Sequence, residues 1–205
     1  MRRLVPVTVL STVLCVVVLS GCSTPVKAGA AAVVGDERVP TSTVEATTTS
    51  VREQAQNEDL GELDGATLNR ITVERAIRSL LTAELAEREG VSVTEGEVDD
   101  YLAEIEAAGQ SEQLNVDALN NGVPSSELRG EVHDFLLRQK VGEELVEGTG
   151  PEVEQERGAA VSEAFVALAE EIGVSVSPRY GTWDTQTVSI LPGEGDLSRL
   201  PSGSP

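Results

Sequence analysis

Residues 67–98 read TLNRITVERAIRSLLTAELAEREGVSVTEGEV, and this stretch decides the class of fold. Its apolar side chains recur at intervals of three and four residues, which is the spacing of one face of an α-helix. Gly90 follows them, and glycine adopts the left-handed conformation that commonly ends a helix. The stretch therefore predicts a long amphipathic helix over residues 67–89, with an apolar face of Val73, Ile77, Leu80, Leu81 and Leu85.

Two further helices are predicted to begin with capping side chains. Ser42 or Thr43 suits the N-cap of a helix that reaches about Ala55. Thr94 and Glu97 have the spacing of a capping box, in which the threonine hydroxyl accepts from a backbone N–H and the glutamate reaches back to the N-cap. We expect the helix that follows this box to bury Val98, Tyr101, Leu102 and Ile105.

The second half of the chain predicts three more helices. A short one is expected over residues 112–121, and Pro124 suits the first position of the next, because proline lacks a backbone N–H. This long helix is expected to bury one side, formed by Leu128, Val132, Phe135, Leu136 and Leu145. A last helix that ends at Gly173 is expected to bury Val161, Ala164, Phe165, Leu168 and Ile172.

A small β element is predicted beside these helices. Residues 30–34 form a short apolar run, and the Gly-Asp pair after them favours a turn. Residues 38–39 would be the return strand, and residues 174–176 add another short extended piece. The fold is therefore predicted to be mainly α, with a helical body and a small two- or three-stranded β element.

The first 22 residues have the three parts of a secretory signal peptide. Arg2 and Arg3 form a positively charged start, residues 4–19 an apolar run, and Leu-Ser-Gly-Cys at residues 19–22 a cleavage site. The apolar run of about 16 residues is shorter than the roughly 20 that a membrane-spanning helix needs. Leu-Ser-Gly-Cys resembles the lipobox of bacterial lipoproteins, which implies cleavage before Cys22 and lipid on its sulfur.

We therefore expect residues 1–21 to be a lipoprotein signal peptide and residues 22–29 a tether. Lipid on Cys22 would hold the protein on the extracytoplasmic face of the cell membrane. The alternative is an uncleaved anchor in which Cys22 is an ordinary small residue, but the Ser-Thr-Pro that follows it is typical of a tether. Cys15 lies in the apolar run and would leave with the signal, so the mature chain is expected to hold no disulfide.

The charge of the chain excludes one class of partner. It has 15 basic and 35 acidic residues and a formal net charge of −20. Affinity for nucleic acid comes largely from lysines and arginines that neutralise phosphates, so nucleic acid is excluded as a partner. Anionic lipid headgroups would also repel the protein, so the lipid anchor is expected to be its contact with the membrane.

Catalytic and metal-binding motifs are missing from the sequence. His133 is the only histidine and lies within a helical pattern, which is too little for a zinc site or for nucleophilic catalysis. Adjacent acids such as Asp99 and Asp100 do not face each other on a helix, so they cannot share a proton-transfer site. The acidic residues at 58–64 lack the ligand spacing of a calcium loop. We expect no cofactor, no metal and no enzymatic activity.

Four segments, in order, match motifs of one family of domains. Residues 32–39 (AVVGDERV) partly match a V-V-N-G-x-x-I opening, without its asparagine. Residues 90–98 match a helix stop followed by V-T-x-x-E-V, and residues 125–140 match a second long helix. Residues 177–184 (SPRYGTWD) resemble an N-P-R-Y-G-x-W close. Together they resemble the N-terminal chaperone domain of SurA, which is also found in PrsA-type foldase lipoproteins and is related to the peptide-binding part of trigger factor.

The resemblance covers residues 30–184 and implies a domain that binds unfolded or newly exported polypeptides. SurA and PrsA carry a parvulin prolyl-isomerase domain between the second long helix and the closing helix. Here residues 146–155 occupy that position, and they are too few for a parvulin domain. The resemblance therefore implies a chaperone-like protein without isomerase activity. Residues 185–205 are rich in Gly, Pro and Ser and are predicted to be a flexible tail.

Tyr180 and Trp183 are the candidate peptide-binding residues. They flank Gly181 in a segment expected to be extended. Aromatic rings contribute much contact area for little lost entropy, so we hypothesise that they line a groove for unfolded clients. The alternative is that they fold back over the core or the hairpin edge. For the whole protein, the alternatives are a scaffolding lipoprotein that docks one specific folded partner, or an isomerase.

Overall fold

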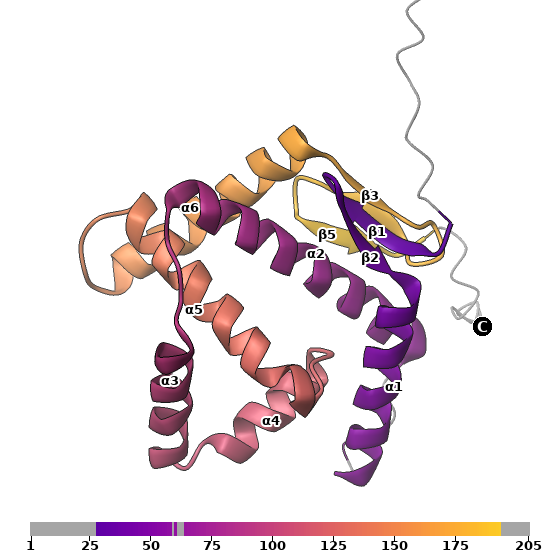
Figure 1. The fold of residues 1–205 in the computed structure, drawn as a ribbon, viewed down its shortest axis with the longest axis horizontal. Coiled ribbons are helices and arrows are strands. Elements are labelled where there is room, and N and C mark those ends of the chain that lie inside the picture. The colour runs from indigo at the N-terminus through magenta and orange to yellow at the C-terminus, as the bar shows by residue number, and fades with distance from the viewer. Residues whose placement is uncertain (1–27, 59, 61–63, 194–205) are drawn as a thin grey trace, which may run out of the picture.

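The computed structural model describes residues 28–58, 60 and 64–193 (Figure 1). Its helices are α1 (Thr41–Asn57), α2 (Gly65–Glu89), α3 (Glu95–Ala107), α4 (Ser111–Asn120), the 3₁₀ helix η1 (Ser125–Glu127), α5 (Leu128–Leu145) and α6 (Pro151–Ile172). Its strands are β1 (Ala30–Val34), β2 (Glu37–Pro40), β3 (Val174–Val176), β4 (Thr182–Asp184) and β5 (Ser189–Leu191). The fold is mainly α with a small β element, as the sequence predicts.

Helix α2 is the centre of the fold. Its residues Val73, Ile77 and Leu81 are fully buried, at 0% exposed, as the apolar periodicity predicts. The helix ends at Gly90, whose φ of 71° is left-handed, so that prediction is also confirmed. It begins at Gly65 rather than at residue 67, because the Asp64 carboxylate caps it by accepting from the Thr67 N–H at 2.7 Å.

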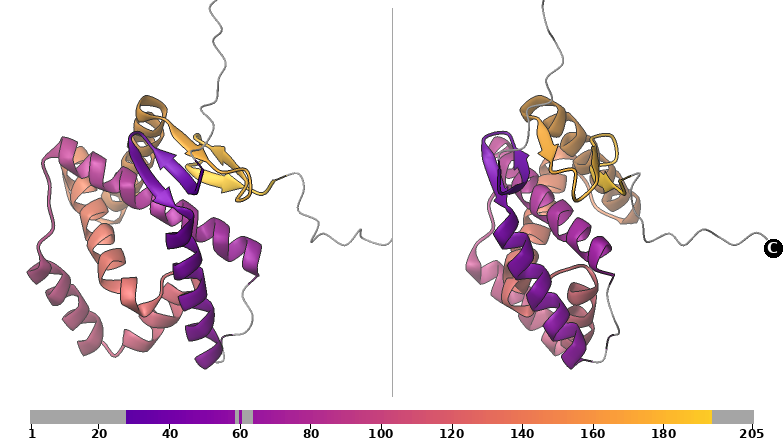
Figure 2. Two further views of the ribbon diagram at one scale, coloured as in Figure 1. Left: turned by 45° about the vertical axis from the view of Figure 1, so that its right-hand side comes forward. Right: turned by 90° about the vertical axis from the view of Figure 1, so that its right-hand side faces the viewer.

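Two small sheets lie beside α2 (Figure 2). The first has the strand order β2-β1-β3, and β1 is antiparallel to both neighbours. Its third strand comes from the end of α6, so the sheet joins two parts of the chain that are far apart in sequence. The second sheet is the β4–β5 hairpin. Val34 and Val39 of the first sheet and Ile190 of the second belong to the same buried cluster as Ile77.

The molecule divides into a body and an arm. The body (residues 28–40, 65–93 and 137–193) holds the main core cluster, to which both sheets, α2, α5 and α6 contribute; α1, which lies outside these ranges, adds Val44. The arm (residues 94–136) consists of α3, α4, η1 and the first half of α5, and it extends from the body on the same side as α1 (Figures 1 and 2). A second, smaller cluster of Val51, Leu68 and Leu119 connects α1, α2 and α4.

Two predicted helix starts are wrong. Helix α1 begins at Thr41 with Pro40 as its N-cap, and neither Ser42 nor Thr43 caps it, because β2 delivers an already extended backbone at Pro40. Helix α5 begins at Leu128, since Pro124 precedes the separate turn of η1.

The predicted buried side of α5 is also wrong. Its buried apolar residues are Val132, Leu137 and Val141, whereas Phe135 and Leu145 are 36% and 37% exposed. With 3.6 residues per turn, Val132 and Val141 lie on opposite sides of the helix. Helix α5 is therefore apolar on more than one side, and the spacing alone cannot select the side that other helices cover.

The predicted tail begins too early. Residues 185–191 form the turn and second strand of the β4–β5 hairpin, and Val188 and Ile190 are 6% and 3% exposed. Arg78 on α2 donates to the Val188 carbonyl oxygen, and the Ile190 N–H donates to Glu74 Oε2 at 3.1 Å. These contacts with a distant helix outweigh the loop-forming composition of the segment. Residues 194–205 lie outside the described residues, as do the predicted signal peptide and most of the tether.

Candidate functional site

The aromatic pair predicted to bind peptides lies in the body. Tyr180 is 8% exposed and belongs to the main core cluster, and Trp183 on β4 is half-buried against the same cluster. The pair thus covers part of the core, which agrees with the alternative, while Tyr180 also lines a hollow beside the β4–β5 hairpin. That the two rings bind peptides stays a prediction. Cys22, the predicted lipid attachment site, lies outside the described residues.

Many apolar side chains of the arm are only partly buried, although Leu119, Val123 and Val132 are buried. Val98 is buried, as predicted, but Tyr101, Leu102 and Ile105 of α3 are only half-buried. Leu114, Val116, Leu128 and Leu136 are also half-buried, and Phe135 is exposed. We call these five side chains, together with Tyr101, Leu102 and Ile105, the apolar set of the arm. None of them belongs to either core cluster.

Tyr101 and Phe135 form the contact between α3 and α5 within this set. Their ring centres are 5.6 Å apart and the rings are tilted by 48°, a favourable arrangement for two aromatic side chains. Phe135 nevertheless remains 36% exposed. The helical spacing did not reveal this surface, because it assigns both residues to buried helix faces. One feature of the sequence could have indicated it: the chain has only five aromatic residues, and two of them lie on these two helices.

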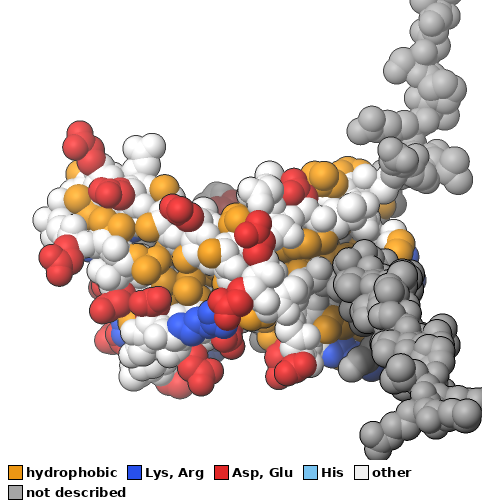
Figure 3. Space-filling view, turned by 90° about the horizontal axis from the view of Figure 1, so that it is seen from above, with side chains coloured by type: hydrophobic (Ala, Val, Ile, Leu, Met, Phe, Trp, Pro, Cys, Tyr) orange, Lys and Arg blue, Asp and Glu red, His pale blue; other side chains and the backbone are white. Residues whose placement is uncertain are grey.

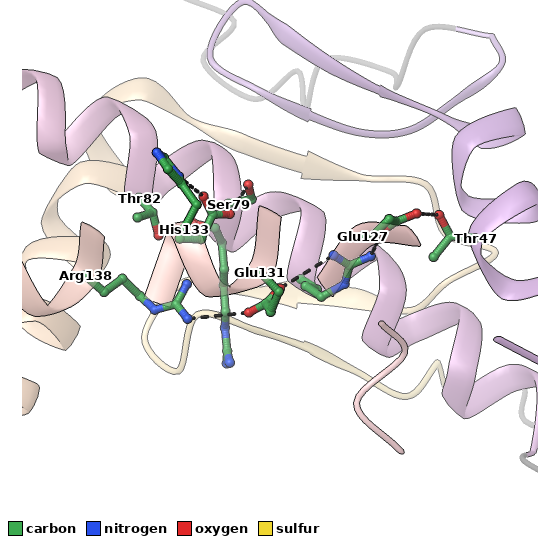
Figure 4. A network of polar contacts seen from close by, with 10 residues as sticks. Thr47, Ser79, Thr82, Glu127, Glu131, His133 and Arg138 are labelled. Carbon is green, nitrogen blue, oxygen red and sulfur yellow. Dashed lines mark hydrogen bonds and ion pairs between the residues drawn. The ribbon is translucent and has the colours of Figure 1, made fainter. Parts of the chain in front are cut away.

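A chain of polar contacts holds the arm to α1 and α2 (Figure 4). The Thr47 hydroxyl on α1 donates to Glu127 Oε1 at 2.6 Å, and Arg75 on α2 donates to the other carboxylate oxygen of Glu127. Glu131 lies between Arg75 and Arg138, with N–O distances of 3.6 and 3.5 Å. Polar side chains therefore attach the arm here, in addition to the small apolar cluster at Leu119, whereas the body is held by a large apolar core.

The other end of the arm is attached through the capping box of α3. Thr94 and Glu97 make both reciprocal hydrogen bonds of the predicted box. The Lys140 ammonium on α5 also contacts the Glu97 carboxylate at 2.5 Å. Lys140 and, after it, the backbone N–H and hydroxyl of Thr94 lower the pKa of Glu97 from 4.5 to about 2. The negative charge of Glu97 thus links α3 to the body.

One known family of domains matches most of the chain. A family model described as SurA-like N-terminal domain matches residues 1–146, which include β1, β2 and the helices up to α5. The chain belongs to this family. No curated protein and no solved structure matches the chain. The match to the SurA-like N-terminal domain ends directly after α5, so α6, β3 and the β4–β5 hairpin lie beyond it, although they complete the core of the body.

The SurA-like N-terminal domain is a chaperone-type, non-catalytic domain, and membership supports a chaperone-like role outside the cytoplasm. In this member of the family, residues 146–150 join α5 directly to α6. No parvulin domain is inserted at this position, as the sequence predicts.

The histidine of this SurA-like domain is not placed for nucleophilic catalysis. His133 Nδ1 is 3.4 Å from Asp134 Oδ1, while the Ser79 hydroxyl donates to Asp134 Oδ2 at 2.5 Å (Figure 4). Both side chains contact the aspartate, and among the described residues no hydrogen bond joins His133 to Ser79, as a nucleophile and its base would require. Within residues 28–58, 60 and 64–193, no three His, Cys, Asp or Glu side chains are grouped to hold a metal, and no helix is long and apolar enough to cross a membrane.

Proposed function

We propose that this protein is a lipid-anchored, chaperone-like protein that binds unfolded, newly exported polypeptides without isomerising their prolines. It acts on the extracytoplasmic face of the cell membrane. Membership of the SurA-like N-terminal domain family supports the chaperone-like role. The lipobox-like motif that ends at Cys22 supports the anchor and the location.

The apolar set of the arm is the observation that carries this proposal. Helices of a small domain normally bury residues such as Leu102, Ile105 and Phe135 in a core, and contiguous exposed apolar surface marks a binding site. Here these side chains remain partly open to solvent and lie outside both core clusters. An unfolded client offers the apolar surface that would complete their burial.

The acidic surface supports the same role. Figure 3 shows acidic side chains distributed over the face seen from above, with few lysines and arginines among them. The formal net charge is −20. Like charge keeps copies of a protein apart in solution. A complex with an aggregation-prone client would remain soluble for the same reason.

The test uses residues 23–205, without lipid, and clients that aggregate when diluted from denaturant. We expect near-stoichiometric protein to suppress light scattering, and a Tyr101→Ser and Phe135→Ser double variant to lose most of this effect while remaining folded. Leu191→Ser is the matched control, because Leu191 is 46% exposed but lies on the body. Equal suppression by all three proteins would exclude the arm as the binding surface. No suppression by the wild-type chain over a range of clients and salt would overturn the proposal.

The anchor has its own test. The mass of the N-terminal peptide of the mature protein should correspond to cleavage before Cys22 with lipid attached. Cys22→Ala should be released or mislocalised and still suppress aggregation in solution. If that variant stayed in the membrane with an unmodified N-terminus, the anchor would be another segment.

Crosslinking in cells separates this proposal from a scaffolding lipoprotein. A photoreactive residue at position 135 should give many products if the arm holds unfolded clients. One dominant product would favour docking of a single folded partner.

A further inference from the structure

A hollow of about 520 Å³ lies where α2, α5, α6 and the turn between β4 and β5 meet. Its volume is within the range of pockets that hold small ligands. Phe165 and Val188 contribute to an apolar side of the hollow. Three arginines also line it: Arg75 and Arg78, one turn apart on α2, and Arg138 on α5. Three acidic residues, Glu131, Asp134 and Glu163, line it as well, so the hollow has no excess of positive charge and its affinity for an anion depends on how each arginine is paired.

Arg78 has a structural role at the rim of the hollow. Its Nε and Nη2 donate to the Val188 carbonyl oxygen at 3.3 and 3.1 Å, and its Nη2 lies 2.9 Å from Glu74. These contacts hold the β4–β5 turn against α2. Arg78 therefore shapes the hollow, and its guanidinium is already engaged.

Arg138 is held much more loosely. Among the described residues its one polar contact is with Glu131 at 3.5 Å, whereas a charge-assisted N–H···O contact is normally about 2.7–2.9 Å. Glu131 lies equally far from Arg75, at 3.6 Å. Arg75 is also paired with Glu127, and its Nε is buried without a hydrogen-bond partner in the described part of the chain. One carboxylate thus lies between two guanidinium groups without a close contact to either.

The other acids of the hollow do not compete for Arg138. Asp134 accepts from the Ser79 hydroxyl at 2.5 Å, and Glu163 is an exposed residue of α6. Neither contacts Arg138 within the residues that the structure describes. Glu131 is therefore the one group that an incoming anion would have to displace.

We propose that this hollow binds a carboxylate group of a client polypeptide, carried beside an apolar residue; this deepens the proposed function and rests on it. The planar fork of Arg138 matches a carboxylate with two parallel hydrogen bonds. The apolar side at Phe165 and Val188 accommodates the neighbouring residue. The carboxylate comes from the end of the chain or from an acidic side chain, which offer the same chemistry.

The experiment titrates lipid-free residues 23–205 into three fluorescent peptides of one apolar sequence, with fluorescence anisotropy as the readout. The first ends in a free carboxylate, the second in an amide, and the third is the amide with one internal glutamate. We expect the free acid to bind about tenfold more tightly than the amide, as for one charge-assisted pair. Comparison of the third peptide with the first shows which source of carboxylate the site prefers.

Two variants should act in opposite directions. Arg138→Ala should abolish the preference for the free acid, and Glu131→Gln, which removes the competing carboxylate, should strengthen it. Misfolding cannot produce both results. Arg129→Ala is the matched control on the same helix, because Arg129 pairs with Glu95 and Asp99 of α3. It should leave the preference unchanged.

The outcomes distinguish this site from the chaperone role. Equal binding of free acid and amide, or a preference that survives Arg138→Ala, would overturn the carboxylate site and leave client binding by the arm intact. A preference that depends on Arg138, in a protein that does not suppress aggregation, would keep the site and overturn the chaperone role. Failure of all three peptides to bind would overturn the site, and the aggregation assay would then decide the function separately.

Discussion

The body and the arm are built from the same kind of amphipathic helix and differ in what covers it. On α2, Ile77 and Leu81 are 0% exposed, because α1, α5, α6 and both sheets pack around that helix. On α3, Leu102 and Ile105 have a similar spacing and are only half-buried, since its main neighbours are α4 and α5. An apolar stripe shows that a surface needs a partner. It does not show whether the partner is the same chain or a client.

The largest expected effect is a difference in the stability lost when the same side chain is truncated in the body and in the arm. Ile77→Ala should lower the free energy of unfolding by about 2–5 kcal/mol, because it leaves a cavity in a packed core. Ile105→Ala removes the same atoms from the arm and should cost about 1 kcal/mol or less, since the site is already partly open to solvent. Urea unfolding of both variants measures the difference. Equal losses would mean that the arm is a second packed core and not an open surface.

The second prediction concerns the hairpin that closes the body. A Cβ at Gly181 would overlap the Leu191 carbonyl oxygen, and the φ of 128° there is one that only glycine adopts readily. Gly181→Ala should therefore displace β5 and destabilise the protein by about 1–3 kcal/mol, as overpacking does. Hydrogen exchange at the Ile190 amide, which donates to Glu74, reports the displacement directly.

Gly193→Ala is the control for the hairpin, because a methyl group on that residue would meet no other atom of the described chain within 4 Å. It should unfold at the same temperature as the wild-type protein. Slow exchange at Ile190 in Gly181→Ala would show that the hairpin tolerates the extra methyl group.

Local interactions account for what the sequence could predict. The end of α2 at Gly90, the capping box of Thr94 and Glu97 and the buried stripe of α2 depend on residues a few positions apart, so their spacing is visible in the chain. The burial of Ile190 depends on Glu74 of a distant helix, and the loop-like composition around it concealed that contact. Both candidate sites likewise depend on contacts between residues that are far apart in the sequence.

The two candidate sites depend on which helix faces meet. The sides of α5 that carry Val132 and Val141 are covered, and the side that carries Phe135 is not. The apolar pattern of α5 does not reveal which sides are covered. Arg75 and Arg138 face one hollow because α2 packs against α5. Such pairings are set by tertiary packing, which the residue types alone do not specify.

The smallest expected effect is a dependence of folding stability on pH. It tests whether the charge of Glu97 attaches α3 to the body. Lys140 and Thr94 lower the pKa of Glu97 from 4.5 to about 2, so ionised Glu97 stabilises the docking of α3. Because the pKa is lowered on folding, this contribution is complete above about pH 5 and is lost as the pH falls from there toward about 2. Glu97→Gln should therefore be less stable than the wild-type protein near pH 7, and the two should converge in acid.

Urea unfolding of both proteins between pH 7 and about pH 2.5 measures this convergence. Glu104→Gln is the control, because Glu104 is an exposed residue of the same helix whose side chain makes no ion pair within the described part of the chain. It removes one negative charge from α3 without touching the capping box. A gap between wild type and Glu97→Gln that stayed constant into acid would mean that the shape of the glutamate, and not its charge, fixes α3. The arm would then be attached by packing, as the body is, and the distinction between the two regions would rest on burial alone.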